Sequence, residues 1–245
     1  MAAAFGSILA LFRDPLESDA GALKSGYAIQ FNEGLKIDFN LWQVEIFQRI
    51  AAALRHYPEL DAGYLVLIDK DHLTDGLQAP SYHAYIPTPP SAAGYLEKVE
   101  TLFVETTYIA KLLWRDDIIA AKEVMDHFMK QEDLNPKLVW RMEIDHHWSV
   151  KPGPLGRRLK QWLRQDLWDA FETTYTGTGI EENWSALWNA IALMRKVSTE
   201  VGTLLGYAYP EAIDRRTMAY LEQVKKLDRS AATFSPDVPA MPAQE

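Results

Sequence analysis

The chain has 245 residues, of which 48% are hydrophobic and 24% are charged, proportions typical of a folded globular protein rather than a disordered or fibrous one. The formal net charge of −9 disfavours general binding to DNA or RNA but is compatible with a cationic ligand. The absence of cysteine excludes disulfides, thiolate zinc sites, iron–sulfur clusters and a cysteine nucleophile. The lack of cysteine leaves the compartment open but fits the reducing cytoplasm, where we expect the protein to be located. No apolar run approaches the roughly 20 residues that a membrane-spanning helix needs, so we expect no membrane segment.

The first third of the sequence predicts a mixture of strands and helices. Apolar residues alternate with small or polar ones in 26–31 and again in 35–41, and Gly34 in the intervening turn can adopt a positive φ, which together predict a β-hairpin. The apolar spacing in 42–56 predicts a helix. The short apolar run 64–68 predicts a buried strand followed by a turn.

A change of pattern marks a candidate domain boundary. Four prolines fall within 80–90, which excludes a helix or a central strand there and predicts a linker. We therefore expect an α+β fold class, with a partial α/β domain in 1–88 and an all-helical bundle of five or six helices in 89–228. The tail, 229–245, is rich in Ala, Pro and Ser and is expected to be disordered.

The helices of the second region are predicted from apolar spacing and from capping residues. Asn135-Pro136 has the pattern of an N-cap followed by proline in the first turn, and Gly206 has the pattern of a C-terminal glycine. The predicted helices are 95–114, 116–130, 135–148, 157–175, 183–205 and 210–227.

Asp38 is the most informative acidic residue of the first region. On the predicted strand its side chain shares one face with Lys36 and Asn40, opposite the apolar residues of the same strand. One interpretation is a solvated sheet face; the other is an open active-site face with Asp38 as metal ligand or base. Because Mg²⁺ with a triphosphate usually needs two carboxylates, Asp38 would require partners.

Other polar patterns are less specific. Lys111 and Arg115 lie four residues apart and share a helix face, which is either solvated or lines a cleft. The segment 153–160 combines glycines with basic residues at a helix start and could hold phosphate or be a plain loop. Adjacent His146 and His147 point about 100° apart on a helix, so they do not form a chelating pair.

Four stretches of the sequence form a pattern in their order and spacing. They are GLKIDF at 34–39, YIAKLLWRDD at 108–117, ENWSALW at 182–188 and LGYAYP at 205–210. Taken together, they resemble the aminoglycoside 6-adenylyltransferase (streptomycin adenylyltransferase) family, and the resemblance runs from about residue 5 to 227. This resemblance implies a nucleotidyltransferase domain of the DNA polymerase beta type, followed by a helical substrate-binding domain.

The resemblance also implies an activity and roles for particular residues. Family members transfer AMP from ATP to a hydroxyl of streptomycin-like aminoglycosides, with Mg²⁺ and a carboxylate base. Asp38 matches the third active-site carboxylate, as metal ligand and catalytic residue, and Glu105 is a further candidate catalytic residue. Lys111, Arg115 and Arg157 match positions expected to contact the nucleotide. The expected partner is thus an aminoglycoside, with no nucleic acid or membrane.

The sequence departs from the family pattern in two places. Pro154 stands where a lysine is expected, which weakens phosphate contact in that segment. The family's opening strand, Gly-Ser turn and paired Asp-x-Asp have no counterpart before the hairpin, and Gly6-Ser7 is not followed by the paired acids. We therefore expect a family member that lacks its first part and is inactive alone. The alternative is a non-catalytic remnant, or a helical protein that binds a cationic ligand.

Overall fold

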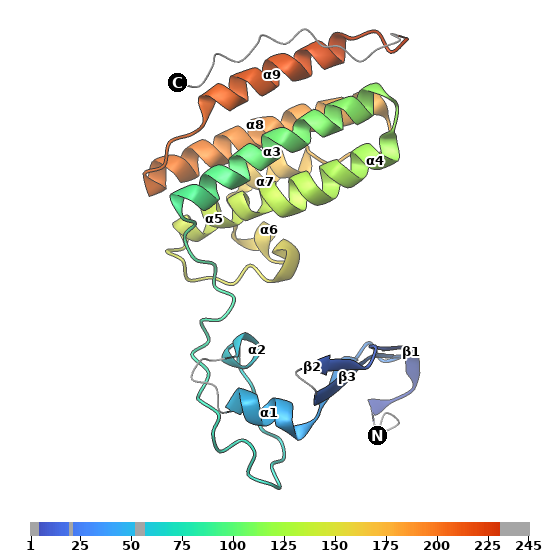
Figure 1. Cartoon of the computed structure of the whole chain (residues 1–245), viewed down its shortest axis with the longest axis vertical. Helices are drawn as coiled ribbons and strands as arrows, with labels where there is room; N and C mark the ends of the chain where they lie inside the picture. Colours follow the sequence, from blue (N-terminus) through green and yellow to red (C-terminus); the bar gives the residue numbers. More distant parts are fainter. Residues whose placement is uncertain (1–4, 20–21, 52–56, 231–245) are drawn as a thin grey trace. The chain divides into compact units, whose positions relative to one another are not determined.

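The computed structural model describes residues 5–19, 22–51 and 57–230. The chain divides into two compact units, Met1–Tyr85 and Ile86–Glu245. The first unit contains an antiparallel sheet and two short helices, and the second is helical, so the predicted α+β class is confirmed (Figure 1). The expected disorder of 229–245 falls almost entirely outside the described residues.

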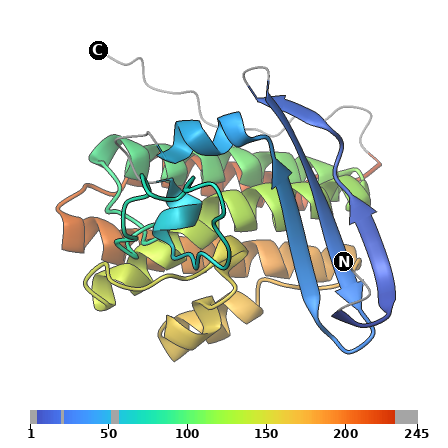
Figure 2. The same cartoon turned by 90° about the horizontal axis from the view of Figure 1, so that it is seen from below.

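The sheet of the first unit is built around one long central strand. It contains β1 (Ile8–Arg13), β2 (Glu17–Asp19), β3 (Ala22–Phe31) and β4 (Lys36–Trp42). All pairings are antiparallel: β1 and β2 pair with β3, and β4 pairs with β3 as well. The β3–β4 hairpin, seen lengthwise in Figure 2, confirms the prediction. Gly34 has a φ of 86°, and its N–H donates to the Phe31 carbonyl at 3.1 Å.

The two faces of this hairpin differ as the alternation predicts. Ile29 and Phe31 of β3 are buried, and Ile37 and Phe39 of β4 are partly buried. The intervening side chains of β4, among them Asp38, are exposed. The polar side chains of β4 therefore lie on an open sheet face.

Beyond the sheet, the first unit contains α1 (Val44–Ala51), α2 (Pro58–Asp61) and an irregular segment. The strand predicted at 64–68 is wrong: these residues are irregular, and Leu65 and Leu67 are 80% and 83% exposed. A short apolar run forms a buried strand only if a neighbouring strand pairs with it, and none of the described strands does.

The proline-rich segment is held by a buried side chain. The carboxylate of Asp61 accepts hydrogen bonds from Ser81 N at 2.5 Å, Ser81 Oγ at 2.8 Å and Ala84 N at 2.9 Å. These bonds pair the backbone N–H groups of Ser81 and Ala84, which have no strand or helix partner. As predicted, 80–90 contains neither helix nor strand.

The second unit consists of long helices joined by short ones. It contains α3 (Ala92–Trp114), α4 (Ile118–Lys122), the π-helix η2 (Glu123–Leu134), α5 (Asn135–Asp145), the 3₁₀ turn η3 (Pro154–Gly156), α6 (Leu159–Trp162), α7 (Gln165–Glu172), α8 (Ile180–Leu205) and α9 (Glu211–Lys226).

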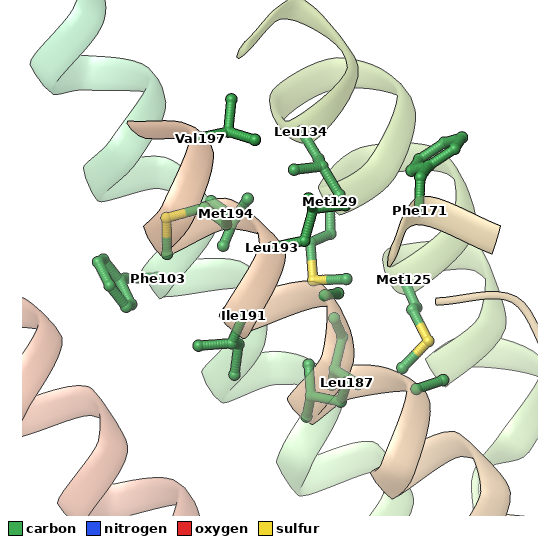
Figure 3. Close-up of a cluster of buried hydrophobic side chains, with 14 of the residues drawn as sticks. Phe103, Met125, Met129, Leu134, Phe171, Leu187, Ile191, Leu193, Met194 and Val197 are labelled. Atoms are coloured by element: carbon green, nitrogen blue, oxygen red, sulfur yellow. The ribbon is translucent and has the colours of Figure 1, made fainter. Parts of the chain in front are cut away.

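The ends of the long helices follow local sequence signals. Ser91 Oγ accepts a hydrogen bond from Gly94 N at 3.1 Å and so caps α3. Gly206 is left-handed, with a φ of 78°, and ends α8 as predicted. Pro210 directly precedes α9. Inside the unit, buried side chains from several helices form one core, which includes Phe103, Met129, Leu187 and Met194 (Figure 3).

Two predicted helix boundaries in this unit are wrong. Asn135 does not cap a new helix, because the preceding Leu134 is already helical and α5 continues directly from η2. The single helix predicted for 157–175 is broken, since Leu163 and Arg164 are extended between α6 and α7. In both cases tertiary packing overrides a local signal of small energy. No helix within the described residues is both long and apolar enough to cross a membrane.

Candidate functional site

Asp38 lies near the middle of β4 on the open sheet face. Its Oδ2 accepts a hydrogen bond from Lys36 Nζ at 2.7 Å, and the two side chains are 55% and 58% exposed. Opposite Asp38 on β3 stands Ala28, and opposite Asn40 stands Gly26. The small residues of β3 leave the polar row of β4 open to a ligand.

The carboxylates of the described residues do not by themselves fit a resident Mg²⁺ centre. Asp38 is already paired with an ammonium group, and no group of three His, Asp or Glu side chains comes together within the described ranges. Mg²⁺ with a triphosphate usually needs two carboxylates in addition to phosphate oxygens. The polar face of β4 thus supplies one carboxylate, which is less than such a centre requires.

Beside Asp38, the same sheet face contains a cavity of about 310 Å³. Asp14 follows β1, and its N–H donates to the Gly26 carbonyl at 2.9 Å, which holds this residue against the central strand. The Asp14 carboxylate lies over the α-carbon of Gly26, where any larger residue would collide with it. The cavity is also lined by Glu17, Lys24, Asn40, Trp42, Tyr57 and Glu59.

In the helical unit, Lys111 and Arg115 line a second cavity, of about 390 Å³, with Tyr108 and Val124. The Lys111 ammonium lies 4.7 Å from the centre of the Tyr108 ring. Neither cation has an ion pair with a described residue. The predicted i,i+4 pair therefore does line a cavity, and it presents two positive charges beside an aromatic ring.

Glu105, the other candidate catalytic residue, lies on α3 six residues before Lys111, in a buried polar cluster. Glu105 Oε2 and Asp133 Oδ2 are buried, and neither has a hydrogen-bond donor among the described residues. Burial and the neighbouring Asp133 charge raise the pKa of Glu105 to about 8.

Two lysines complete this cluster. Lys98 Nζ contacts Asp133 Oδ1 at 3.0 Å. Lys137 Nζ donates to the carbonyls of Lys98 at 2.6 Å and Asp133 at 2.9 Å, and burial lowers the pKa of Lys137 to about 7. The cluster joins α3, η2 and α5.

Arg157 is exposed and lies in the loop before α6. Its N–H donates to the Pro154 carbonyl at 3.2 Å, and the N–H of Arg158 donates to the Pro152 carbonyl at 2.8 Å. The helix α6 has only four residues, and the backbone amides of Arg157 and Arg158 are already hydrogen-bonded. A phosphate could therefore be bound here by the Arg157 side chain but not by a set of free backbone amides. Arg157 does not line the cavity of Lys111 and Arg115.

The histidines have local structural roles. His146 Nε2 lies 3.2 Å from the Trp162 carbonyl, and the two rings meet edge to face. His147 has a φ of 54° in the turn that ends α5. Neither belongs to a candidate metal cluster of the described chain.

Sequence reasoning did not identify Asp14 or the ring of Tyr108 as parts of a cavity. For Asp14 a signal exists in the sequence: Gly26 is an isolated glycine inside a strand, which often marks a close approach of another group. For Tyr108 the signal is its position three residues before Lys111, on the same helix face. Asp38 lies in the first unit, whereas Glu105 and the three cations lie in the second.

Comparisons with known proteins agree with this architecture. The family model described as Streptomycin adenylyltransferase matches residues 2–224. An aminoglycoside 6-adenylyltransferase of Bacillus subtilis (strain 168) is 26% identical over 185 residues, covering 76% of this chain and 63% of that protein. One of Campylobacter jejuni is 26% identical over 200 residues, covering 82% and 66%.

A solved structure shows the same fold. The crystal structure of an aminoglycoside 6-adenyltransferase from Bacillus subtilis aligns with a TM-score of 0.55 at 22% identity, covering 91% of this chain and 80% of that one. The chain spans less than two thirds of the length of the curated relatives that it matches. Because the family model covers most of its residues, the chain belongs to the streptomycin adenylyltransferase family.

Proposed function

We propose that this chain belongs to an enzyme that transfers AMP from ATP to a hydroxyl group of a streptomycin-like aminoglycoside. The chain contributes the strand with Asp38 and the ligand-binding cavities. Such a transfer would confer antibiotic resistance. The observation that carries the proposal is the family match over residues 2–224. In this reaction the hydroxyl oxygen attacks the α-phosphorus, the bond to pyrophosphate breaks, and the hydroxyl proton passes to a base.

The cavity of Lys111 and Arg115 supports a role in nucleotide binding. Two cations one helical turn apart suit the oxygens of a polyphosphate, and the adjacent Tyr108 ring offers an aromatic face to a base. Arg157 is proposed as a third phosphate contact. Its exposed side chain is available, although Pro154 replaces the lysine expected beside it.

Asp38 and Glu105 are proposed as the catalytic carboxylates. Asp38 lies on an open face, where a substrate can reach it. Glu105 has a raised pKa of about 8, close to the range in which a general base works at neutral pH. Mg²⁺ is expected to accompany ATP, but the described carboxylates do not fit it on their own, so no step is assigned to it.

Equilibrium binding of ATP and of streptomycin to the purified chain tests this proposal. We expect both to bind, and we expect Lys111→Ala with Arg115→Ala to weaken ATP binding at least about tenfold, because each charge-assisted contact contributes about 1.5–3 kcal/mol. Lys226→Ala with Arg229→Ala is the matched control for charge. If the chain fails to bind ATP, or fails to bind streptomycin, the proposal is overturned.

A second candidate is a non-catalytic protein that binds a cationic ligand. The absence of a three-carboxylate group within the described residues favours it. This candidate predicts streptomycin binding without ATP binding. The two titrations therefore separate it from an adenylyltransferase.

A further inference from the structure

We infer that Asp14 is a specificity-determining residue, which binds an ammonium or guanidinium group of the acceptor in the cavity between the sheet and α2. This inference rests on the proposed function, because it names the subsite that orients the acceptor toward Asp38. Asp14 and all the other residues that line the cavity belong to the first unit.

The position of Asp14 is fixed by the backbone of β3. Its N–H donates to the Gly26 carbonyl, which extends the β1–β3 pairing by one residue. Its carboxylate then occupies the space that a side chain at position 26 would fill, and the Asn40 Oδ1 lies 3.3 Å from the same point. A carboxylate oxygen and an amide oxygen thus converge from two strands over one glycine.

The chemistry of this cavity favours a cation. Its ionisable lining consists of three carboxylates and one ammonium, and the ammonium of Lys24 is already paired with Glu17 at 3.0 Å. Asp14 has no ion pair with a described residue, so its charge remains available. A phosphate would meet repulsion here. A metal ion would lack the cluster of ligands that it requires.

The walls of the cavity point to an organic cation rather than an inorganic one. Trp42 and Tyr57 line it, and aromatic rings bind ammonium and guanidinium groups through cation–π contacts. Its volume of about 310 Å³ is at the lower end for small-molecule sites, which suits one amino-substituted ring rather than a whole aminoglycoside.

The location of the cavity connects it to the proposed reaction. Asn40 lies two residues after Asp38 on the same strand, so the two side chains share a face at a separation of about 7 Å. A ring held by Asp14 and Asn40 therefore has Asp38 within about one ring's length. Because of this short separation, Asp14 would select which acceptor binds beside Asp38, instead of being an isolated acidic residue on the surface.

Calorimetric titration with streptomycin tests the inference directly. Asp14→Asn keeps the size of the side chain over Gly26 and removes its charge, and we expect the dissociation constant to rise at least about tenfold. Asp71→Asn makes the same change of net charge at an exposed position of the same unit and should leave the constant within twofold. Gly26→Ala should weaken binding as well, because its methyl group displaces the Asp14 carboxylate.

The outcomes separate this inference from the proposed function. A folded Asp14→Asn variant that binds streptomycin within twofold of the wild type overturns the inference, whatever the result with ATP. A wild-type chain that binds no streptomycin overturns it too. If streptomycin binding depends on Asp14 but the chain does not bind ATP, the inference holds as a cation site and the proposed adenylyl transfer fails.

Discussion

Burial, together with the charge of Asp133 on η2, raises the pKa of Glu105 on α3 to about 8 inside the helical unit. Each of the two carboxyl groups has a buried oxygen without a hydrogen-bond partner among the described residues. Lys98 and Lys137, which surround the pair, balance the remaining charge. A carboxyl group that holds its proton up to about pH 8 in the folded chain, but loses it near 4.5 when unfolded, links stability to pH.

The first prediction concerns this linkage. Between pH 4.5 and about 8 the folded state binds more protons at Glu105 than the unfolded state does. Its contribution to the free energy of unfolding is therefore complete below pH 4.5 and is lost as the pH rises toward 8. Glu105→Gln keeps a hydrogen-bond donor toward Asp133 and should flatten this dependence.

Urea unfolding at several pH values between 5 and 8 measures this pH dependence of the free energy of unfolding. Glu100→Gln changes an exposed residue of the same helix and should follow the wild-type curve. Parallel curves for Glu105→Gln and the wild type would show that folding does not raise the pKa of Glu105.

The second prediction contrasts the ion pair of a buried carboxylate with that of an exposed one. Asp214 is 7% exposed and accepts hydrogen bonds from Arg195 Nε and the Tyr209 hydroxyl, each at 2.7 Å. Asp214→Ala leaves both donors without their acceptor and should cost about 2–3 kcal/mol of unfolding free energy. Glu17 pairs with Lys24 on the surface, and Glu17→Ala should cost no more than about 1 kcal/mol. If chemical denaturation shows that the two alanine variants lose equal unfolding free energy, the prediction is wrong.

The third prediction concerns the independence of the helical unit. Residues 89–228 have their own caps and one continuous core, so we expect them to fold without the first unit. Limited proteolysis should cut first in the irregular segment 62–90 and leave a helical fragment. Early digestion of the helices with the sheet left intact would refute the prediction.

The fourth prediction concerns catalysis by the chain alone. Asp38 by itself does not fit a metal centre, and charge stabilisation of that kind contributes several kcal/mol to a rate. With ATP, Mg²⁺ and streptomycin, we expect no multiple turnover of adenylylated product by mass spectrometry. Clear turnover that Asp38→Ala abolishes would disprove this expectation.

The fifth prediction applies to any form of the enzyme that turns over. Asp38→Asn should lower the rate at least about a hundredfold, as expected for the loss of one preorganised charge. His146→Ala and His147→Ala should remain within a few-fold of the wild-type rate, because His146 contacts the Trp162 carbonyl and His147 lies in a turn. An active Asp38→Asn enzyme beside an inactive, folded histidine variant would reverse these roles.

Local signals in the sequence determined several features of this protein. The alternation around Asp38 placed its side chain on the polar face of β4, and the glycine signals at Gly34 and Gly206 identified the hairpin turn and the end of α8. The spacing of Lys111 and Arg115 placed them on one face of α3. These features depend on backbone conformation and on periods of two or 3.6 residues, which neighbouring residues alone specify.

Other features depended on partners far away in the chain. The apolar run 64–68 formed no strand because no described strand pairs with it. The raised pKa of Glu105 arises only when folding buries this carboxyl group and η2 brings the charge of Asp133 near α3. Likewise, Asp14 gains its role only when β1 pairs with β3, because that pairing holds its carboxylate over a residue twelve positions later.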